Sequence, residues 1–260
     1  MTLYTHLQDI DRNYRTVITA SGGMDSAAVA CLHALAGETS NVLMVHVNME
    51  TQVYGGAPWQ IASEKVADLL GIDLLVVENS LASFAHKGDI GRSYIPGYRL
   101  FWALPTLAAM DHVDAHVMET GYRLPSVDAD DNVMENAEVT HMREITGAVD
   151  ADSAVNREGR LHYIQDFADM YCDMHGMDER VGDIEVVAPL ESFSRAGVIK
   201  LLAVTGQVCN HRAPMNILGA TMTCHTPIRV PGGSSLAFAP CGDCTFCEIN
   251  KQALAQADIK

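Results

Sequence analysis

The sequence predicts an α/β protein built on a doubly wound, mostly parallel sheet and followed by a C-terminal zinc-binding segment. The sheet is predicted by short apolar runs that alternate with longer amphipathic stretches between residues 16 and 121, the pattern of consecutive strand–helix units. The zinc-binding segment is predicted by four cysteines after residue 220, three of them close together. A glycine-rich turn after the first apolar run indicates where a ligand binds.

Length, composition and charge limit the classes of protein to which the chain can belong. It has 260 residues, of which 48% are hydrophobic, enough for a sizeable core. Its 17 basic and 33 acidic residues give a net charge of −16, which repels polyphosphate chains, so we expect no nucleic-acid partner. We find neither an apolar run that could span a bilayer nor a secretory signal, and therefore expect a cytoplasmic protein without a membrane partner.

The first half of the chain predicts three strands and two helices in alternation. Residues 16–20 are a short β-branched run, typical of a central parallel strand, and the Ala-rich residues 26–37 form a helix that ends at a glycine. Residues 41–49 form a second buried strand. Residues 57–71 have apolar side chains at helical spacing, and residues 73–79 form a third strand. The short connections between these elements predict a doubly wound sheet.

Further elements continue the same alternation after an interruption. Residues 99–113 predict a buried helix, with a kink near its proline, and residues 114–121 predict a fourth strand. Residues 184–190 predict a strand that ends at a proline, and residues 194–206 a helix that ends at a glycine.

The domain organisation follows from where this pattern weakens. Residues 1–210 are predicted to form one α/β domain, and residues 211–260 a cysteine-rich tail packed on it. Within the domain, residues from about 124 to 183 are acidic and rich in turn-forming residues, so we expect an insertion or a mobile lid over the site there. Residues 1–15 are expected to be a helical or irregular lead-in.

The turn at residues 21–26, Ser-Gly-Gly-Met-Asp-Ser, connects the first predicted strand to the first predicted helix. Small residues at such a junction leave backbone N–H groups and the positive end of the helix dipole available to bind phosphate oxygens. The alternative is a tight turn in which Ser26 only caps the helix. The string is neither a Walker A motif nor a GxGxxG motif.

Seven cysteines in a protein expected in the reducing cytosol do not predict disulfides. Four of them follow the pattern C-x16-C-x2-C-x2-C, and they are Cys224, Cys241, Cys244 and Cys247. Four thiolates at this spacing predict a closed, structural zinc site. An iron–sulfur cluster is the main alternative, since it also takes four thiolates.

The turn resembles the pyrophosphatase loop (PP-loop) of the ATP pyrophosphatase superfamily, which has a Rossmann-like fold. This resemblance implies that ATP is cleaved between its α and β phosphates and that an acceptor oxygen is adenylated. It also implies that Asp25 and Ser26 are catalytic and that Asp25 positions Mg²⁺. The residues that it implies for binding ATP are Ala20, Ser21, Gly22, Gly23, Met24, Asp25 and Ser26.

The loop and the cysteine tail together resemble 7-cyano-7-deazaguanine synthase, an enzyme of queuosine-type 7-deazaguanine biosynthesis. "VYGGAPWQIASEKVADLLGI", "YIPGYRLFW", "APLESFSRAGVIKLLAVTG", "TMTCH" and "CGDCTFC" resemble segments of that family in the same order. The resemblance implies that ATP and ammonia convert 7-carboxy-7-deazaguanine to the nitrile through an adenylate and an amide. It further implies a homodimer, and substrate contacts from Tyr54, Gly55 and Arg99.

Three other functions remain open at this point. The Tyr-Pro-Asp-Cys stretch of the family has no counterpart after residue 119, so the chain could stop at 7-amido-7-deazaguanine or use another acceptor. A PP-loop tRNA sulfurtransferase would need a basic face for tRNA, which a net charge of −16 opposes. The third is a non-catalytic, zinc-dependent binding module, which the intact SGGMDS string opposes.

Overall fold

The computed structural model describes residues 1–48, 57–78, 86–87, 93–94, 98–122, 158–175, 183–209, 216–224, 226–231 and 237–259. Its centre is a sheet with the strand order β1-β4-β3-β2-β7-β8, in which every pairing is parallel. The strands are β1 (Leu3–Tyr4), β2 (Thr16–Thr19), β3 (Val42–Asn48), β4 (Asp73–Glu78), β7 (Val117–Glu119) and β8 (Glu185–Val187). Two antiparallel pairs lie outside this sheet: β5 (His86–Lys87) with β6 (Ser93–Tyr94), and β9 (Ile228–Arg229) with β10 (Phe238–Ala239).

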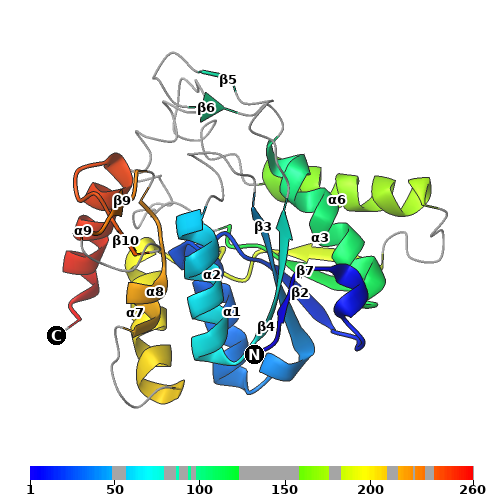
Figure 1. Cartoon of the computed structure of the whole chain (residues 1–260), viewed down its shortest axis with the longest axis horizontal. Helices are drawn as coiled ribbons and strands as arrows, with labels where there is room; N and C mark the ends of the chain where they lie inside the picture. The colour runs from blue at the N-terminus through cyan, green and yellow to red at the C-terminus, as the bar shows by residue number, and fades with distance from the viewer. Residues whose placement is uncertain are drawn as a thin grey trace.

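Helices cover both faces of the sheet (Figure 1). One face packs against α1 (Met24–Ala36), α2 (Ala57–Leu70) and α7 (Arg195–Cys209), with α8 (Asn216–Ala220) and α9 (Thr245–Ala257) beyond them. The other face packs against α3 (Tyr98–His112) and α6 (Glu158–Met174). Short 3-10 helices, η1 (Leu7–Asp9) and η2 (Thr39–Asn41), complete the described elements. The predicted α/β fold with a doubly wound, parallel sheet is therefore confirmed.

Consecutive residues on the central strands pack into opposite halves of the core. Side chains alternate between the faces of a strand, so Val17 packs on the side of α3 and Ile18 on the side of α1. On β3, Leu43 and Met44 divide in the same way. Burial on both faces explains why consecutive residues on these strands are apolar, as in the run from Val42 to Val45, where a strand with one exposed face would alternate with polar residues.

The order of the strands places a crevice beside β2. The chain moves from β2 to β3 and β4 on one side, and then returns to add β7 and β8 on the other side. The loops that follow β2 and β7 therefore leave the sheet in opposite directions. Ligands of doubly wound proteins bind at such a switch point, outside the carboxyl ends of the strands.

Every strand and helix that the sequence predicts between residues 16 and 121 is present, and its ends differ from the prediction by no more than three residues. The same holds for β8 and α7. Several described elements were not predicted. Among them are β1, which lies in the expected lead-in and pairs with β4, the helix α6, and α9, which begins at the cysteines. None of the described helices has the length and apolar composition needed to cross a membrane.

The insertion or lid expected at about residues 124–183 stays a prediction, and the described part of that span contains the helix α6. This helix buries Ile164, Ala168 and Cys172 against the core that α3 also covers, and Gln165 bonds to the backbone of β8. The buried apolar residues of α6 are hard to recognise in the sequence, because only one side of the helix is buried and the other residues are mostly polar or acidic. Residues 123–157 and 176–182 lie outside the described part of the chain.

A partly buried ion pair between α1 and β7 predicts a pH dependence of stability. His33 Nε2 and Glu119 Oε2 are 2.7 Å apart, and the hydrogen bond to Glu119 raises the pKa of His33. The pair therefore stabilises the fold fully below the unfolded-state pKa of about 6.5, and its contribution is lost as the pH rises through the folded-state pKa. Across that window we expect the unfolding free energy to fall by about 1–2 kcal/mol.

Urea denaturation of wild type and His33→Gln at a series of pH values from 6 to 9 gives the unfolding free energy of each protein. The difference between the two free energies at each pH measures the contribution of the His33–Glu119 pair. The difference should shrink as the pH rises. His6→Gln, at an exposed position, should follow the wild type at every pH. A difference that stays constant over the range would contradict the assignment.

Candidate functional site

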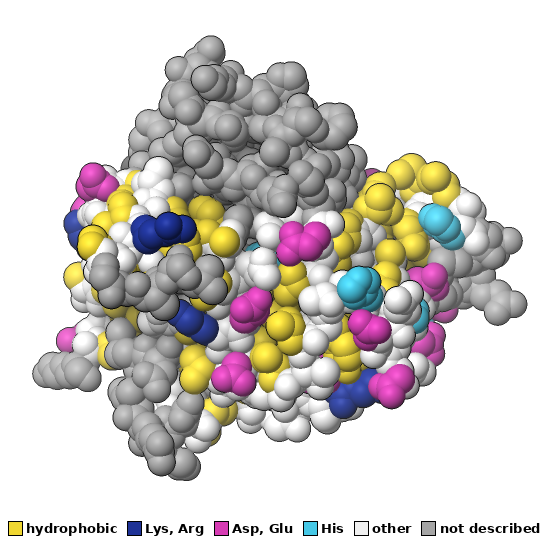
Figure 2. Space-filling model, viewed as in Figure 1, with side chains coloured by type: hydrophobic (Ala, Val, Ile, Leu, Met, Phe, Trp, Pro, Cys, Tyr) yellow, Lys and Arg dark blue, Asp and Glu magenta, His cyan; other side chains and the backbone are white. Residues whose placement is uncertain are grey.

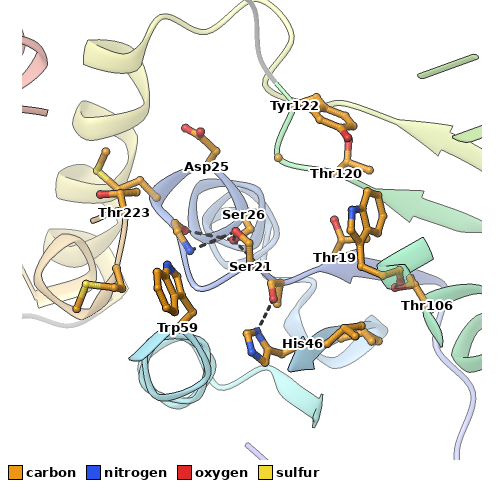
Figure 3. Close-up of a pocket in the computed structure, with 18 of the residues that line it drawn as sticks. Thr19, Ser21, Asp25, Ser26, His46, Trp59, Thr106, Thr120, Tyr122 and Thr223 are labelled. Carbon is orange, nitrogen blue, oxygen red and sulfur yellow. Dashed lines mark hydrogen bonds between the residues drawn. The ribbon is translucent and has the colours of Figure 1, made fainter. Parts of the chain in front are cut away.

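A cavity of about 450 Å³ opens at the switch point (Figure 3). It is lined by the end of β2 and the loop after it, by the ends of β3 and β7, and by side chains of α2, α3, α7 and the cysteine tail. Of the residues implied for ATP, Ala20, Ser21, Gly23, Met24, Asp25 and Ser26 line it, and Gly22 lies between them in the chain. The cavity is thus formed around the SGGMDS string.

Hydrogen bonds within the loop fold it around the first turn of α1. Ser21 N–H donates to Ser26 Oγ at 3.2 Å, Gly23 N–H donates to Ser21 Oγ at 3.3 Å, and Ser26 Oγ–H donates to the Gly23 carbonyl at 3.2 Å. The N-cap of α1 is Gly23, and its position has no side-chain cap. Ser26 is therefore not a helix cap, and the positive end of the α1 dipole lies at the cavity.

Gly22 occupies a place where no other residue fits. Its φ of 76° lies in the left-handed region, which L-residues with a side chain rarely adopt. A Cβ at this position would lie 2.2 Å from the carbonyl oxygen of Trp59 on α2. On its other side, the Gly22 carbonyl accepts a hydrogen bond of 2.8 Å from Met222 of the tail. The loop is consequently held between α2 and the tail.

Gly121, at the end of β7, allows a second close approach. A Cβ there would lie 2.8 Å from the amide nitrogen of Ser26 and 2.9 Å from the carbonyl carbon of Asp25. Gly121→Ala should therefore displace the first turn of α1 and weaken binding of ATP, the ligand that the loop implies, at least about tenfold. Overpacking of this kind costs about 1–3 kcal/mol.

Fluorescence titration with ATP measures this effect, since both tryptophans of the chain, Trp59 and Trp102, line the cavity. Gly219→Ala on α8 is the matched control, because its Cβ would meet no atom within 4 Å. Wild-type affinity in Gly121→Ala would show that the close approach does not set the loop geometry.

Arg195 is a functional candidate that the sequence analysis missed. It begins α7, its side chain is only 7% exposed, and Nη2 lies 3.7 Å from Oδ2 of Asp25. It also lines the cavity. A buried guanidinium at a predicted phosphate site can bind phosphate oxygens or the developing charge of a leaving group. The sequence offers one signal, a basic residue in the first turn of a predicted helix, but does not place it near residue 25.

His46 contributes a hydrogen bond rather than a charge. Its Nδ1 lies 2.7 Å from the Ala20 carbonyl, which can only accept, so Nδ1 carries the proton. Burial lowers the pKa of His46 to about 4, and the ring is neutral at physiological pH. It fixes the end of β2, where the loop begins. Among the described residues that line the cavity, the charges therefore come from Asp25 and Arg195.

The half of the cavity opposite Asp25 is neutral and partly aromatic. In Figure 3, Thr19, Thr106, Thr120 and Tyr122 lie across the cavity from Asp25 and Thr223. Trp102 of α3 lines the same cavity. Hydroxyl groups beside aromatic rings suit a flat, uncharged ring system that makes specific hydrogen bonds.

The predicted substrate residues are not tested by this geometry. Tyr54 and Gly55 lie outside the described residues. Arg99 is in the first turn of α3, and its side chain is also outside the described part.

The four predicted metal ligands lie together in the tail. Their sulfur atoms are all within 4.8 Å of one another, and Cys224 Sγ lies 3.4 Å from Cys241 Sγ and 3.9 Å from Cys244 Sγ. A tetrahedral zinc ion with bonds of about 2.3 Å places its sulfur ligands about 3.8 Å apart. The cluster has the dimensions of a site for one ion.

The surroundings of the cluster favour a bound cation. Burial raises the pKa of the Cys247 thiol to about 12 and also raises that of Cys224, so thiolates there need a compensating positive charge. Cys244 is the N-cap of α9 and Cys247 lies in its first turn, where the helix dipole favours thiolates. The Cys241 N–H donates to Cys224 Sγ at 3.2 Å, a contact that orients a ligand sulfur.

No protein-family model matches the chain, and no curated protein matches it. Among solved structures, it is similar to the U34-tRNA thiolase NcsA from Methanococcus maripaludis with its 4Fe-4S cluster. The similarity covers 82% of this chain and 65% of that chain, with 15% sequence identity and a TM-score of 0.43. The chain thus spans somewhat less than two thirds of the length of NcsA. A similarity of this extent assigns neither a family nor an activity.

Proposed function

We propose that the chain is an AMP-forming, ATP-dependent carbon–nitrogen ligase of the PP-loop ATP pyrophosphatase superfamily, with a structural metal in its tail. One observation carries this proposal: the SGGMDS loop lies at the switch point of a parallel sheet, with uncapped N–H groups of α1 and the buried Arg195 at the same cavity. Backbone donors and a guanidinium together bind a polyphosphate chain. They would also stabilise the charge that develops on departing pyrophosphate.

The substrate that we propose is 7-carboxy-7-deazaguanine. Its carboxylate oxygen attacks the α-phosphorus of ATP, pyrophosphate leaves, and an acyl adenylate forms. Ammonia adds to the acyl carbon and AMP leaves with the electron pair of the broken C–O bond, which gives the amide and releases a proton. A second ATP then adenylates the amide oxygen and releases pyrophosphate, and loss of AMP and of both amide protons gives the nitrile. The neutral, hydroxyl-lined half of the cavity suits the flat deazaguanine ring.

Asp25 suits the Mg²⁺ that accompanies ATP. Its carboxylate lines the cavity, is partly exposed, and offers the hard oxygen ligand that this ion prefers. Mg²⁺ would neutralise charge on the phosphates during transfer. Arg195 lies close enough to restrain the Asp25 side chain before ATP arrives.

For the tail we propose a single zinc ion instead of an iron–sulfur cluster. The sulfur atoms lie within 4.8 Å of one another, close enough to share one ion. An iron–sulfur cube places a separate iron behind each thiolate, so its cysteines lie farther apart. Four thiolates leave no open position, and we therefore assign this metal to structure and not to the chemical step.

Incubation with ATP, Mg²⁺, ammonium and 7-carboxy-7-deazaguanine tests the proposal. We expect AMP and pyrophosphate, and a product whose mass identifies the amide or the nitrile. Asp25→Asn should lose turnover and keep its metal, whereas Glu248→Gln, an exposed change on α9, should have wild-type activity.

Each alternative has its own outcome in the same assay. The amide as final product would identify a shortened reaction, and turnover only with a sulfur donor and tRNA would replace the ligase by a sulfurtransferase. The acidic side chains spread over the face in Figure 2 offer tRNA little attraction. Absence of ATP binding at the loop would refute the superfamily assignment itself.

A further inference from the structure

The metal-binding tail forms part of the cavity wall. Met222 and Thr223, directly before the first cysteine ligand, line the cavity, and so does Phe246, between the last two ligands. The cluster packs in one small core with Trp59 and Ala62 of α2. A tail that only stabilised the fold at its periphery would not need to place residues in the cavity lining.

Two hydrogen bonds and an ion pair connect the segment beside Cys224 to the PP-loop. Asn250 lies one turn after Cys247 on α9, and its Oδ1 accepts a hydrogen bond of 3.2 Å from Arg195 Nη1. Its Nδ2 donates to Thr223 Oγ1 at 2.6 Å, beside Cys224. The other end of the guanidinium, Nη2, lies 3.7 Å from Asp25 Oδ2. Asn250 therefore contacts both the segment that bears a metal ligand and the cation at the nucleotide loop.

This arrangement limits where the Arg195 side chain can lie. The guanidinium is planar and its nitrogens are fixed relative to one another, so a bond at Nη1 restricts the direction of Nη2. Asn250 can hold it only while α9 keeps its place, and the start of α9 carries two of the four metal ligands. Without its metal the tail would unfold. Its residues would then no longer line the cavity, and Asn250 would no longer bond to Arg195.

We propose that Asn250 is a positioning residue through which the metal-bound tail controls the nucleotide site: it holds Arg195 against Asp25, and ATP binds tightly only while the tail is folded on its metal. This inference rests on the proposed function, because the ligand whose affinity changes is ATP. Hydrogen bonds to charged groups contribute about 1.5–3 kcal/mol, so loss of this one should weaken ATP binding about 10- to 100-fold.

Asn250→Leu removes the amide and keeps a similar volume. We expect full metal content by mass spectrometry of the metal, a thermal midpoint lowered by several degrees because the buried guanidinium loses a hydrogen bond, and ATP affinity lower by the factor above in the tryptophan titration. Thr223→Val removes only the hydrogen bond from Asn250 Nδ2 to Thr223 Oγ1. It should also lower ATP affinity, but by a smaller factor than Asn250→Leu. Gln252→Leu is the control on the same helix: its described bond is to Glu248, and its ATP affinity should equal that of wild type.

A double-mutant cycle separates positioning from a merely structural role. In an Arg195→Lys background, Asn250→Leu should cause little further loss of ATP affinity, because its effect passes through the guanidinium. Wild-type protein stripped of metal by a chelator should also bind ATP at least as weakly as Asn250→Leu, and re-addition of zinc should restore binding.

The outcomes distinguish this inference from the proposed function. Wild-type ATP affinity in metal-loaded Asn250→Leu, or equal losses in both backgrounds of the cycle, would overturn the role of Asn250. Full ATP affinity in the metal-free protein would overturn the control by the tail. Both results require a wild type that binds ATP; a wild type that does not bind it overturns the proposed function itself.

Discussion

Gly22→Ala is expected to abolish ATP binding and to lower the free energy of unfolding by about 3 kcal/mol. The new methyl group would lie 2.2 Å from the Trp59 carbonyl oxygen, and backbone atoms on both sides would have to move. The left-handed φ of 76° adds strain for any residue with a Cβ. Movement of the loop would also break the bond from Met222 to the Gly22 carbonyl, which is 2.8 Å long.

Gly37→Ala is a matched control for the conformational part of this effect. Gly37 caps α1 with a φ of 74°, and a Cβ there would meet nothing within 4 Å. It should lose about 1–2 kcal/mol of stability from strain alone and bind ATP normally. Chemical denaturation gives both free energies, and the tryptophan titration gives both affinities. Equal stability losses in the two variants would mean that α2 yields to the added methyl group.

Cys247→Ala is expected to release the metal and unfold the tail. Binding of structural zinc contributes about 10–16 kcal/mol in small zinc-finger peptides, and removal of one of four thiolates leaves an open, weaker site. Because the small core around the cluster includes Trp59, its loss should also expose one side of α2. Metal analysis, the thermal midpoint and trypsin cleavage after Arg229 and Lys251 measure the three consequences.

Cys209→Ala provides the comparison for this cysteine. Cys209 is the exposed last residue of α7 and is not among the four clustered sulfurs. Its replacement should leave metal content, thermal midpoint and protease resistance unchanged. Full metal content in Cys247→Ala would contradict the assignment of this residue as a ligand.

The elements that the sequence could predict are those whose signal is local. Val17 and Ile18, in the β-branched run at residues 16–19, are both apolar because both faces of β2 are buried. Gly37 ends α1 because its backbone adopts the left-handed conformation. The spacing of Cys241, Cys244 and Cys247 likewise reflects one turn that brings neighbouring thiols together. Each of these features depends on residues a few positions apart.

The helix α6 and the strand β1 have no such local signal. One side of α6 is polar and exposed, so its buried stripe is dilute in the sequence, and Leu3–Tyr4 is too short to show a period. The partner of β1 is distant in the chain, since Leu3 pairs with Leu74, and α6 packs on a core to which β2, β3 and α3 contribute. Pairing with an existing sheet edge, and not intrinsic preference, makes a two-residue strand.

The sequence by itself determined the parallel α/β sheet, the glycine-rich turn at residues 21–26 and the four-cysteine pattern, because strand burial, glycine conformation and cysteine spacing depend on neighbouring residues. Only the tertiary structure decided that Arg195 lies against Asp25, that Gly121 contacts the start of α1, and that Asn250 connects the tail to the loop. These contacts join segments far apart in the chain. Their positions are set by how helices pack on the sheet, and no local pattern of residue types records that packing.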